Sequence, residues 1–363
     1  MGVPDGLHRE SRTARARQLA THLLLPSYIS LLALAAGGAE PAGSRFTFTE
    51  PHMGTRFQIL LYAADEATAK QAARDAFKRI AELDGIMSDY RPTSELMRLC
   101  QKAGGPPARV SEDLFVVLSR AQEVSRLSGG AFDVTVGPVV RLWRRARKTQ
   151  QLPDPEKLAH ARALVGYRNV HLDARARTVR LAREGMQLDL GGIAKGYAAD
   201  AALAVLRRHG ITKGLVAAGG DIAVSGAPPG KKGWTIGIAP LEDPEQKPKR
   251  YLLLHDAAVS TSGDSEQYVE IGGKRYSHII DPRTGMGLVG RASVTVVGPS
   301  GLTVDPLTKV VSVLGPRRGL EIIDSLKGVS CLAVRKTERG LETFTSRRFP
   351  NTSQGGKPDP ERQ

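Results

Sequence analysis

The sequence has little cysteine and few aromatic residues. Cys100 and Cys331 are its only cysteines among 363 residues. Two cysteines are too few for a Cys-ligated zinc site or a disulfide framework, so one distant disulfide or two free thiols remain open. Aromatic residues make up 5% of the chain, and no basic cluster is richly interleaved with them. We therefore expect no nucleic-acid partner, because single-stranded nucleic acid is bound largely by base stacking.

The sequence also lacks an apolar run long enough to cross a bilayer comfortably, which takes about 20 residues. The longest candidate runs over about 14 residues, from Leu23 to Ala36. Four arginines between Arg9 and Arg17 precede it, and small residues continue through Ala39. This order of cationic flank, short apolar segment and small residues is typical of a secretory signal.

The signal-like segment predicts export, to the periplasm or to the outer face of the cytoplasmic membrane. Cleavage is expected after Ala35 or Ala39, and no cysteine lies there to carry a lipid. An imperfect N-terminal helix or an uncleaved anchor is the alternative, because Pro26, Ser27 and Ser30 interrupt the apolar segment.

Residues 1–39 are thus assigned to export, residues 45–349 to one domain and residues 350–363 to a polar, disordered tail.

Apolar spacing and capping residues predict helices over 65–87, 111–128, 193–209 and 305–314. The predicted strands are 56–63, 169–172, 178–181, 235–239, 251–255, 267–271, 275–280 and 292–297. Residues 153–157 are predicted to form a turn. Because these elements do not alternate regularly, an α+β fold is favoured over a doubly wound parallel sheet.

The charge balance points to an anionic ligand. The chain carries 52 Lys and Arg against 37 Asp and Glu, a formal net charge of +15, which attracts nucleic acid, anionic membranes or phosphorylated ligands without choosing among them. Within the segment Asp189-Leu190-Gly191-Gly192-Ile193-Ala194-Lys195, paired glycines precede a predicted helix. Glycines allow close backbone approach and a helix N-terminus attracts anions, so this segment is a candidate phosphate site. A glycine-bearing turn is the alternative, since neither a Walker loop nor G-x-G-x-x-G fits.

A second polar segment, YSHIIDPRTG, covers residues 276–285. It combines an imidazole, a carboxylate, a guanidinium and a hydroxyl at the end of a predicted strand, and loops with such side chains are often functional. His278 could accept a proton from an attacking hydroxyl, because imidazole titrates near neutral pH. A hydrogen-bonded structural histidine is the alternative. A serine hydrolase is disfavoured, because the chain has no G-x-S-x-G turn.

Eight segments, in order, resemble the ApbE family, the FAD:protein FMN transferases. They are MGTRF (53–57), MSDYRPTSEL (87–96), GGAFDVTVGPVVRLW (129–143), DLGGIAKGYAAD (189–200), AAGGDIAVSG (217–226), VSTSGD (259–264), YSHIIDPRTG (276–285) and ASVTVVGPSGLTVDPLTKVVSVLG (292–315). The resemblance spans roughly residues 53–334. It implies an α+β fold with mixed or antiparallel sheets and helices around a central FAD cleft.

The resemblance also implies roles for individual residues. The FAD site would comprise Met53, Tyr90, Gly130, Ala131, Phe132, Asp189, Lys195, His278 and Ile279. His278 would lie near the reacting phosphate as the catalytic residue. Mg2+ would be held by the pyrophosphate, the Gly192 carbonyl and the Asp305 carboxylate, since magnesium prefers oxygen ligands.

One residue departs from the family pattern. Where the family has a metal-ligating Thr four residues after the Asp, this chain has Lys309. A protonated lysine cannot bind a cation. Thr308 could replace the missing ligand, Lys309 could supply the charge of Mg2+, or metal and activity could both be lost. We expect Thr308 to serve as the replacement metal ligand. FAD binding should then be tight, and FMN transfer should be reduced and dependent on Mg2+. Lys309→Thr should raise the rate of transfer.

The resemblance implies transfer of FMN from FAD to a Ser or Thr hydroxyl of an acceptor flavoprotein, with release of AMP. The acceptor is expected to be a membrane-associated redox subunit. Two alternatives stay open: an FAD-binding protein without transfer activity, and an Mg2+-dependent FAD pyrophosphatase in which water replaces the acceptor hydroxyl.

Overall fold

The computed structural model describes residues 43–242, 246–263 and 268–350. The chain divides into residues 1–40 and 41–363, and the fold described here belongs to the second unit. The predicted signal segment and, apart from Pro350, the predicted tail lie outside the described residues. Within the described part, no helix is both long and apolar enough to span a membrane.

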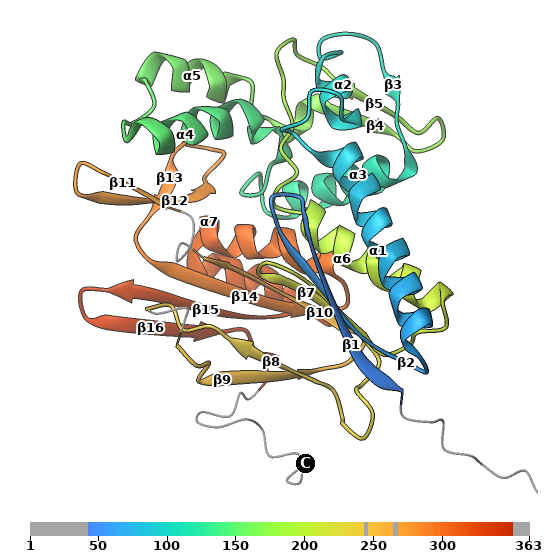
Figure 1. The fold of residues 1–363 in the computed structure, drawn as a ribbon. Helices are drawn as coiled ribbons and strands as arrows, with labels where there is room; N and C mark the ends of the chain where they lie inside the picture. Colours follow the sequence, from blue (N-terminus) through green and yellow to red (C-terminus); the bar gives the residue numbers. More distant parts are fainter. Residues whose placement is uncertain (1–42, 243–245, 264–267, 351–363) are drawn as a thin grey trace, which may run out of the picture. The chain divides into compact units, whose positions relative to one another are not determined.

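An eight-stranded antiparallel sheet forms the centre of the fold (Figure 1). Its strands, in spatial order, are β1 (Ser44–His52), β2 (Thr55–Ala63), β6 (Gly214–Ala218), β7 (Asp221–Ser225), β10 (Ala257–Gly263), β14 (Ala292–Gly298), β15 (Ser330–Thr337) and β16 (Gly340–Thr345). Burial alternates along β2, so Phe57, Ile59 and Leu61 lie in the core. Three smaller sheets comprise β3 (Ala108–Arg109), β5 (Thr178–Leu181) and β4 (Val170–Asp173); β8 (Trp234–Ile238) and β9 (Arg250–Leu254); and β11 (Tyr268–Ile271), β12 (Lys274–Ile280) and β13 (Gly287–Val289).

Helices cover one face of the large sheet. The α-helices are α1 (Glu66–Met87), α2 (Glu95–Cys100), α3 (Glu112–Leu127), α4 (Gly137–Thr149), α5 (Pro155–Ala163), α6 (Ala194–Arg208) and α7 (Gly301–Ser325). Short 3-10 turns span Val134–Val136 and Tyr167–Asn169. α1, α6 and α7 pack on the large sheet and on each other, while β8 and β9 pack against its other face through a separate apolar cluster.

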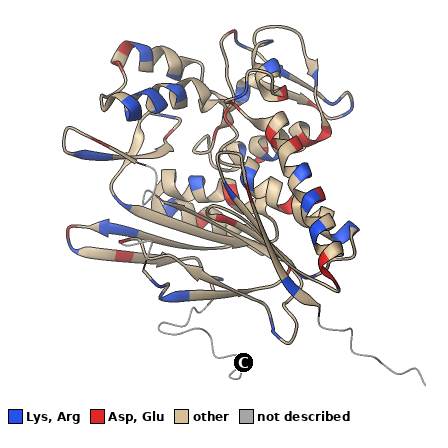
Figure 2. Cartoon of the chain, in the orientation of Figure 1, with Lys and Arg blue, Asp and Glu red and all other residues tan. Residues whose placement is uncertain are grey.

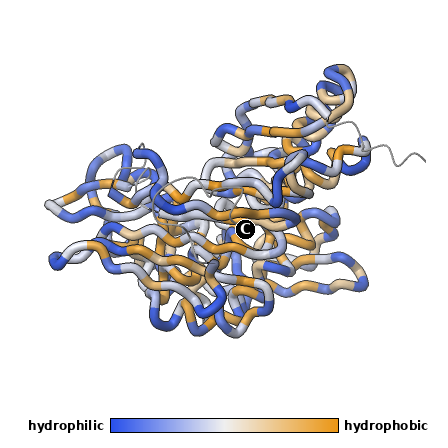
Figure 3. The backbone as a smooth tube through the Cα atoms, turned by 90° about the horizontal axis from the view of Figure 1, so that it is seen from below, coloured by the Kyte–Doolittle hydropathy of each residue, from blue (hydrophilic) through white to orange (hydrophobic). Residues whose placement is uncertain are grey.

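A smaller substructure carries α4, α5 and the sheet β11–β12–β13 (Figure 1). Its apolar residues form a cluster of their own around Trp143 and Tyr276. The Trp143 indole N–H donates to the Gly285 carbonyl at 2.8 Å and so ties α4 to the turn after β12. Lys and Arg residues are dense on α4, whereas the strands of the large sheet carry few charges (Figure 2). Hydrophobic residues run through the strands and hydrophilic residues gather at many outer turns (Figure 3).

The α+β prediction is confirmed, and most predicted elements are found within one or two residues of their expected bounds. Two predictions are wrong. Residues 153–157 do not form only a turn, because Asp154 caps α5 by accepting from the Lys157 N–H at 2.9 Å. The last long helix does not begin at Asp305 but after Ser300, so Asp305 lies within α7.

The early start of α7 has a tertiary cause. The Asp200 carboxylate, on α6, accepts from the backbone N–H groups of Gly301 and Leu302 at 2.8 and 2.9 Å. Ser300 adds a cap from its own side chain, accepting from the Thr303 N–H at 3.3 Å. These contacts satisfy N–H groups that a helix start otherwise leaves without partners. Asp305 is therefore not the N-cap of α7 and lies inside the helix.

Candidate active site

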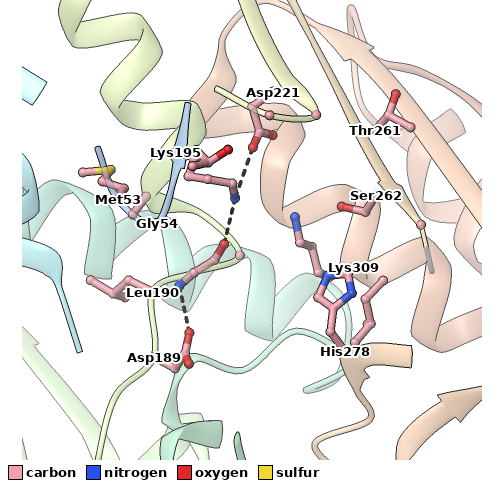
Figure 4. Close-up of a pocket in the computed structure, with 18 of the residues that line it drawn as sticks. Met53, Gly54, Asp189, Leu190, Lys195, Asp221, Thr261, Ser262, His278 and Lys309 are labelled. Atoms are coloured by element: carbon pink, nitrogen blue, oxygen red, sulfur yellow. Dashed lines mark hydrogen bonds and ion pairs between the residues drawn. The ribbon is translucent and has the colours of Figure 1, made fainter. Parts of the chain in front are cut away.

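A cavity of about 870 Å³ lies where segments distant in the sequence meet. It is lined by the β1–β2 turn, the end of α1, the loop before α6, the β6–β7 turn and parts of β8, β10, β12 and α7. Figure 4 shows Lys195 and Asp221 on one side of this space and His278 and Lys309 on the other. The cavity therefore brings together both polar segments that the sequence indicated.

The loop before α6 is held by a carboxylate. Asp189 accepts from the Gly191 N–H at 2.8 Å and from the Arg144 guanidinium at 2.8 Å. Burial raises the pKa of Asp189 most, the nearby Asp89 raises it further, and Arg144 opposes both. These contacts fix the loop whose glycines, Gly191 and Gly192, line the cavity.

Lys195 lies in the first turn of α6 and joins three chain segments. Its ammonium donates to the Gly191 carbonyl at 3.0 Å and lies 3.2 Å from Asp221 Oδ2 and 3.9 Å from Asp305 Oδ2. Burial lowers the pKa of Lys195, but the two carboxylates outweigh burial and raise it above its usual value. Lys195 is therefore a fixed cation beside the helix N-terminus, an arrangement that suits a phosphate group.

Asp221 is a site residue to which the family resemblance of the segment AAGGDIAVSG (217–226) assigned no role. It follows the Gly219-Gly220 turn between β6 and β7, is 4% exposed, and accepts from the Ser260 hydroxyl at 2.6 Å. Its second oxygen pairs with Lys195. Asp221 lies closer to the ammonium than Asp305 does, so together with the Gly191 carbonyl it sets the direction in which the ammonium points.

His278 lies on β12 at an irregularity of the strand pairing. Tyr276 pairs with Val289 and Ile280 with Gly287, and the register shifts between these pairs. Bulged strand residues are common next to active sites, because the irregularity redirects a side chain. His278 and Ile279 both line the cavity. The following turn is fixed by Asp281, which accepts from the Arg283 guanidinium at 2.9 and 2.8 Å.

An aromatic residue lies at the rim of the cavity. Tyr90 is 71% exposed, and the guanidinium of Arg144 lies 4.0 Å from its ring centroid. Arg144 also pairs with Asp89 and Asp189. Arg144 lines the cavity although it lies on a helix with several other basic residues, and its neighbour Trp143 is buried.

The residues predicted to bind FAD lie along this cavity with one exception. The cavity is lined by Met53, Tyr90, Ala131, Phe132, Asp189, Lys195, His278 and Ile279. Gly130 is absent from its lining. It has a φ of +84°, and an added Cβ would lie 3.4 Å from the Tyr167 ring. Its role is therefore to shape the turn that presents Ala131 and Phe132.

The predicted metal ligands do not form a magnesium site. Thr308 is fully buried; its hydroxyl donates to the Asp305 carbonyl at 2.7 Å and is 2.8 Å from the Ser262 hydroxyl. The Asp305 carboxylate is paired with the Lys309 ammonium and accepts from the Gly196 N–H at 3.2 Å. Gly192 lines the cavity, whereas Asp305 and Thr308 do not. The arrangement does not fit a divalent cation, because ammonium groups are paired with the Asp305 carboxylate and the Thr308 hydroxyl is already hydrogen-bonded to the Asp305 carbonyl.

The described residues also contain no cluster of three or more His, Cys, Asp and Glu side chains suited to a metal ion. The buried, hydrogen-bonded position of the Thr308 hydroxyl does not support the expectation that Thr308 replaces the missing ligand. The sequence could not reveal this, because residues three and four positions after Asp305 lie on nearly the same helix face.

Comparison with known proteins identifies the family of the chain. The model of the ApbE family matches residues 53–333. The chain belongs to the ApbE family. An FAD:protein FMN transferase of Treponema pallidum is 32% identical over 85% of this chain and 90% of its own length. One from Vibrio cholerae is 32% identical over 90% of this chain and 97% of its own length.

Solved ApbE structures share the fold. The flavin transferase ApbE from Vibrio cholerae superposes with a TM-score of 0.75 at 30% identity, covering 85% of this chain and 98% of the other. The apo form of the flavinyl transferase ApbE from Pseudomonas stutzeri also has a TM-score of 0.75, at 28% identity, covering 86% and 98%. The predicted resemblance to the ApbE family is confirmed.

Proposed function

We propose that the protein is an FAD:protein FMN transferase that takes FAD into the 870 Å³ cavity and transfers its FMN part to an acceptor hydroxyl. One observation carries the proposal: Lys195, at the start of α6, and His278, at the irregular part of β12, line the same cavity. The first group suits a phosphate and the second suits a proton transfer, and phosphoryl transfer to a hydroxyl requires both.

The transfer step is as follows. The acceptor Ser or Thr hydroxyl gives its proton to the His278 imidazole, and its oxygen forms a bond to the phosphorus of the FMN part. The bond from that phosphorus to the bridging oxygen of the diphosphate breaks, and AMP leaves with that oxygen. The Lys195 ammonium, at the start of α6, stabilises the negative charge of the diphosphate.

No step is assigned to a metal ion, because the residues around Asp305 do not fit magnesium. Lys309 supplies one positive charge where a divalent cation would supply two, so slower transfer than with a bound divalent cation is expected. This reduced activity is part of the proposal.

Incubation with FAD and a Ser- or Thr-containing acceptor peptide, followed by mass measurement, tests the proposal. The expected result is a peptide heavier by one FMN group and an equal amount of AMP. Free FMN and AMP without labelled peptide would indicate hydrolysis, and bound FAD without AMP would indicate a binding protein. Thermal unfolding is expected to shift upward with FAD but not with FMN or NAD, because a ligand that binds the native state stabilises it.

Location and acceptor are further parts of the proposal. The arginines and the apolar run between Arg9 and Ala36 support export to the periplasm or to the outer face of the cytoplasmic membrane. Fractionation of cells followed by mass measurement of the N-terminus tests this. For an exported transferase, the proposed acceptor is a membrane-associated redox subunit. Recovery of FMN covalently bound to a membrane protein only in cells that express the transferase would support it.

A further inference from the structure

The Lys309 side chain lies against two residues, Asp305 and Gly192, that the family resemblance assigns to a metal ion. It is ion-paired with Asp305 Oδ1, and it donates to the Asp305 carbonyl at 3.2 Å. Its side chain passes over Gly192, since a Cβ added there would lie 3.4 Å from Lys309 Cε. The lysine comes from α7 and the glycine from the loop before α6. One side chain thus links the carboxylate and the glycine loop.

The charges around this ammonium are already balanced without a divalent cation. Asp221 and Asp305 face Lys195 and Lys309, and the distances from Lys195 to the two carboxylates are 3.2 and 3.9 Å. A divalent cation entering here would meet two ammonium groups and a carboxylate already paired.

Lys309 also faces the ligand side of the cavity, whereas Asp305 lies behind it. The lysine side chain is 16% exposed and lines the cavity, and Asp305 is fully buried. An ammonium has three N–H donors, and within the described residues the two recorded acceptors both belong to Asp305. The third N–H can therefore reach a ligand oxygen. Figure 4 shows Lys309 and Lys195 reaching into the same space.

We infer that Lys309 replaces the divalent cation of this site, so that the protein binds the diphosphate of FAD with two lysines, Lys195 and Lys309, and without magnesium. This inference rests on the proposed function only in taking FAD as the ligand. A lysine is a compact point charge that suits a phosphate oxygen. Lys309→Thr removes the ammonium and restores the residue type of the family pattern, so it is expected to create a site that requires a metal ion.

Equilibrium binding of FAD to the full chain, followed by quenching of flavin fluorescence, tests the inference. The wild-type protein is expected to bind FAD with the same Kd, within about twofold, in EDTA and in Mg2+. Lys309→Thr is expected to bind FAD at least about tenfold more weakly in EDTA, as for loss of a charged hydrogen bond, and to recover affinity in Mg2+. Lys309→Met, which offers neither charge nor hydroxyl, should bind weakly in both.

Metal binding gives a second readout that does not depend on activity. With FAD present, Mn2+ titration followed by electron paramagnetic resonance should show about one Mn2+ per chain for Lys309→Thr and none above the FAD-only blank for the wild type. Lys327→Thr, an exposed lysine after α7, serves as the matched control and should behave as wild type. Thermal unfolding verifies that each variant is folded.

Two outcomes would overturn the inference, and they are distinguishable. Wild-type FAD affinity that depends on Mg2+, or stoichiometric Mn2+ binding by the wild type, would show that Lys309 does not replace the cation while leaving the transferase proposal intact. No FAD binding under any condition would remove the transferase proposal as well.

Discussion

Gly196 of α6 and Gly301 of α7 lie in direct backbone contact. A Cβ added to Gly196 would lie 2.3 Å from the Gly301 carbonyl oxygen, and one added to Gly301 would lie 2.2 Å from the Gly196 carbonyl oxygen. This contact allows the Gly196 N–H to donate to Asp305 Oδ2 at 3.2 Å. The crossing of the two helices therefore brings Lys195 beside Asp305.

Gly196→Ala is expected to destabilise the fold by roughly 1–3 kcal/mol, because the new methyl group must separate two packed helices. It should also weaken FAD binding by moving Lys195. Gly85→Ala is the matched control: Gly85 lies within α1, and an added Cβ there meets nothing within 4 Å. This control is expected to stabilise the fold by about 0.5–1 kcal/mol. Chemical denaturation measures both, and equal effects would contradict the packing argument.

His278→Ala is expected to lower FMN transfer roughly 10²-fold, because proton transfer by a positioned side chain contributes about this much. FAD binding should change little, since the charged contacts to the diphosphate come from other residues. Transfer assays and FAD-induced thermal shifts measure the two effects separately. His171→Ala, at an exposed position on β4, is the control. An unchanged transfer rate for His278→Ala would remove the residue from the mechanism.

Tyr90→Ala is expected to weaken FAD binding by about tenfold without lowering thermal stability. Stacking of a planar ring on an aromatic side chain contributes about 1–3 kcal/mol, whereas a side chain that is 71% exposed buries little in the fold. Tyr268→Ala is the control, because Tyr268 is also exposed and also stacked with an arginine, but does not line the cavity. Equal FAD affinities for the two variants would argue against a role for Tyr90.

Asp281→Asn is expected to lower the free energy of unfolding at neutral pH, and to lower it by a smaller amount in acid. Burial raises the pKa of Asp281, but its hydrogen bonds with Arg283 outweigh burial, so the folded pKa lies below the ordinary value of 3.8. A depressed pKa gives stability that is present above pH 3.8 and is lost as the pH falls through the folded pKa. Arg283 is half-exposed, so the contribution is only about 1 kcal/mol.

Denaturation of wild type and Asp281→Asn at several pH values measures this effect. The difference in unfolding free energy should be largest near pH 7 and should shrink below about pH 4. A difference that grows on acidification would contradict the assigned direction of the pKa shift.

Local patterns in the sequence predicted four of the seven α-helices and eight of the sixteen strands that the structure describes. The spacing of apolar residues and the cap at Asp65 predicted α1, and the cap at Ser111 predicted α3. The start of α7 could not be predicted in this way, because Asp200 reaches it from another helix. Six strands of the large sheet also lay outside the predicted strands, namely β1, β6, β7, β10, β15 and β16. Their pairing partners are set by the large sheet rather than by a strong pattern of their own.

The residues of the site also divide into those that local sequence patterns indicated and those that only the tertiary fold brings together. Glycines before a helix and a polar turn after a strand are local signals, and they indicated Lys195 and His278. Arg144, Asp221 and the inward position of Lys309 depend on how α4, β7 and α7 meet around the cavity. Nothing in the sequence around Arg144 distinguished it from the other arginines of its helix.

The bond from the Trp143 indole to the Gly285 carbonyl has a consequence for local stability. His278 belongs to a strand packed in the small cluster around Trp143, whereas α6, which carries Lys195, packs in the main core. Such separate clusters can open at different free energies. Amide hydrogen exchange should therefore be faster along β12 than along β6 and β7. When β12 opens locally, His278 leaves its place, but Lys195 stays in position to bind FAD.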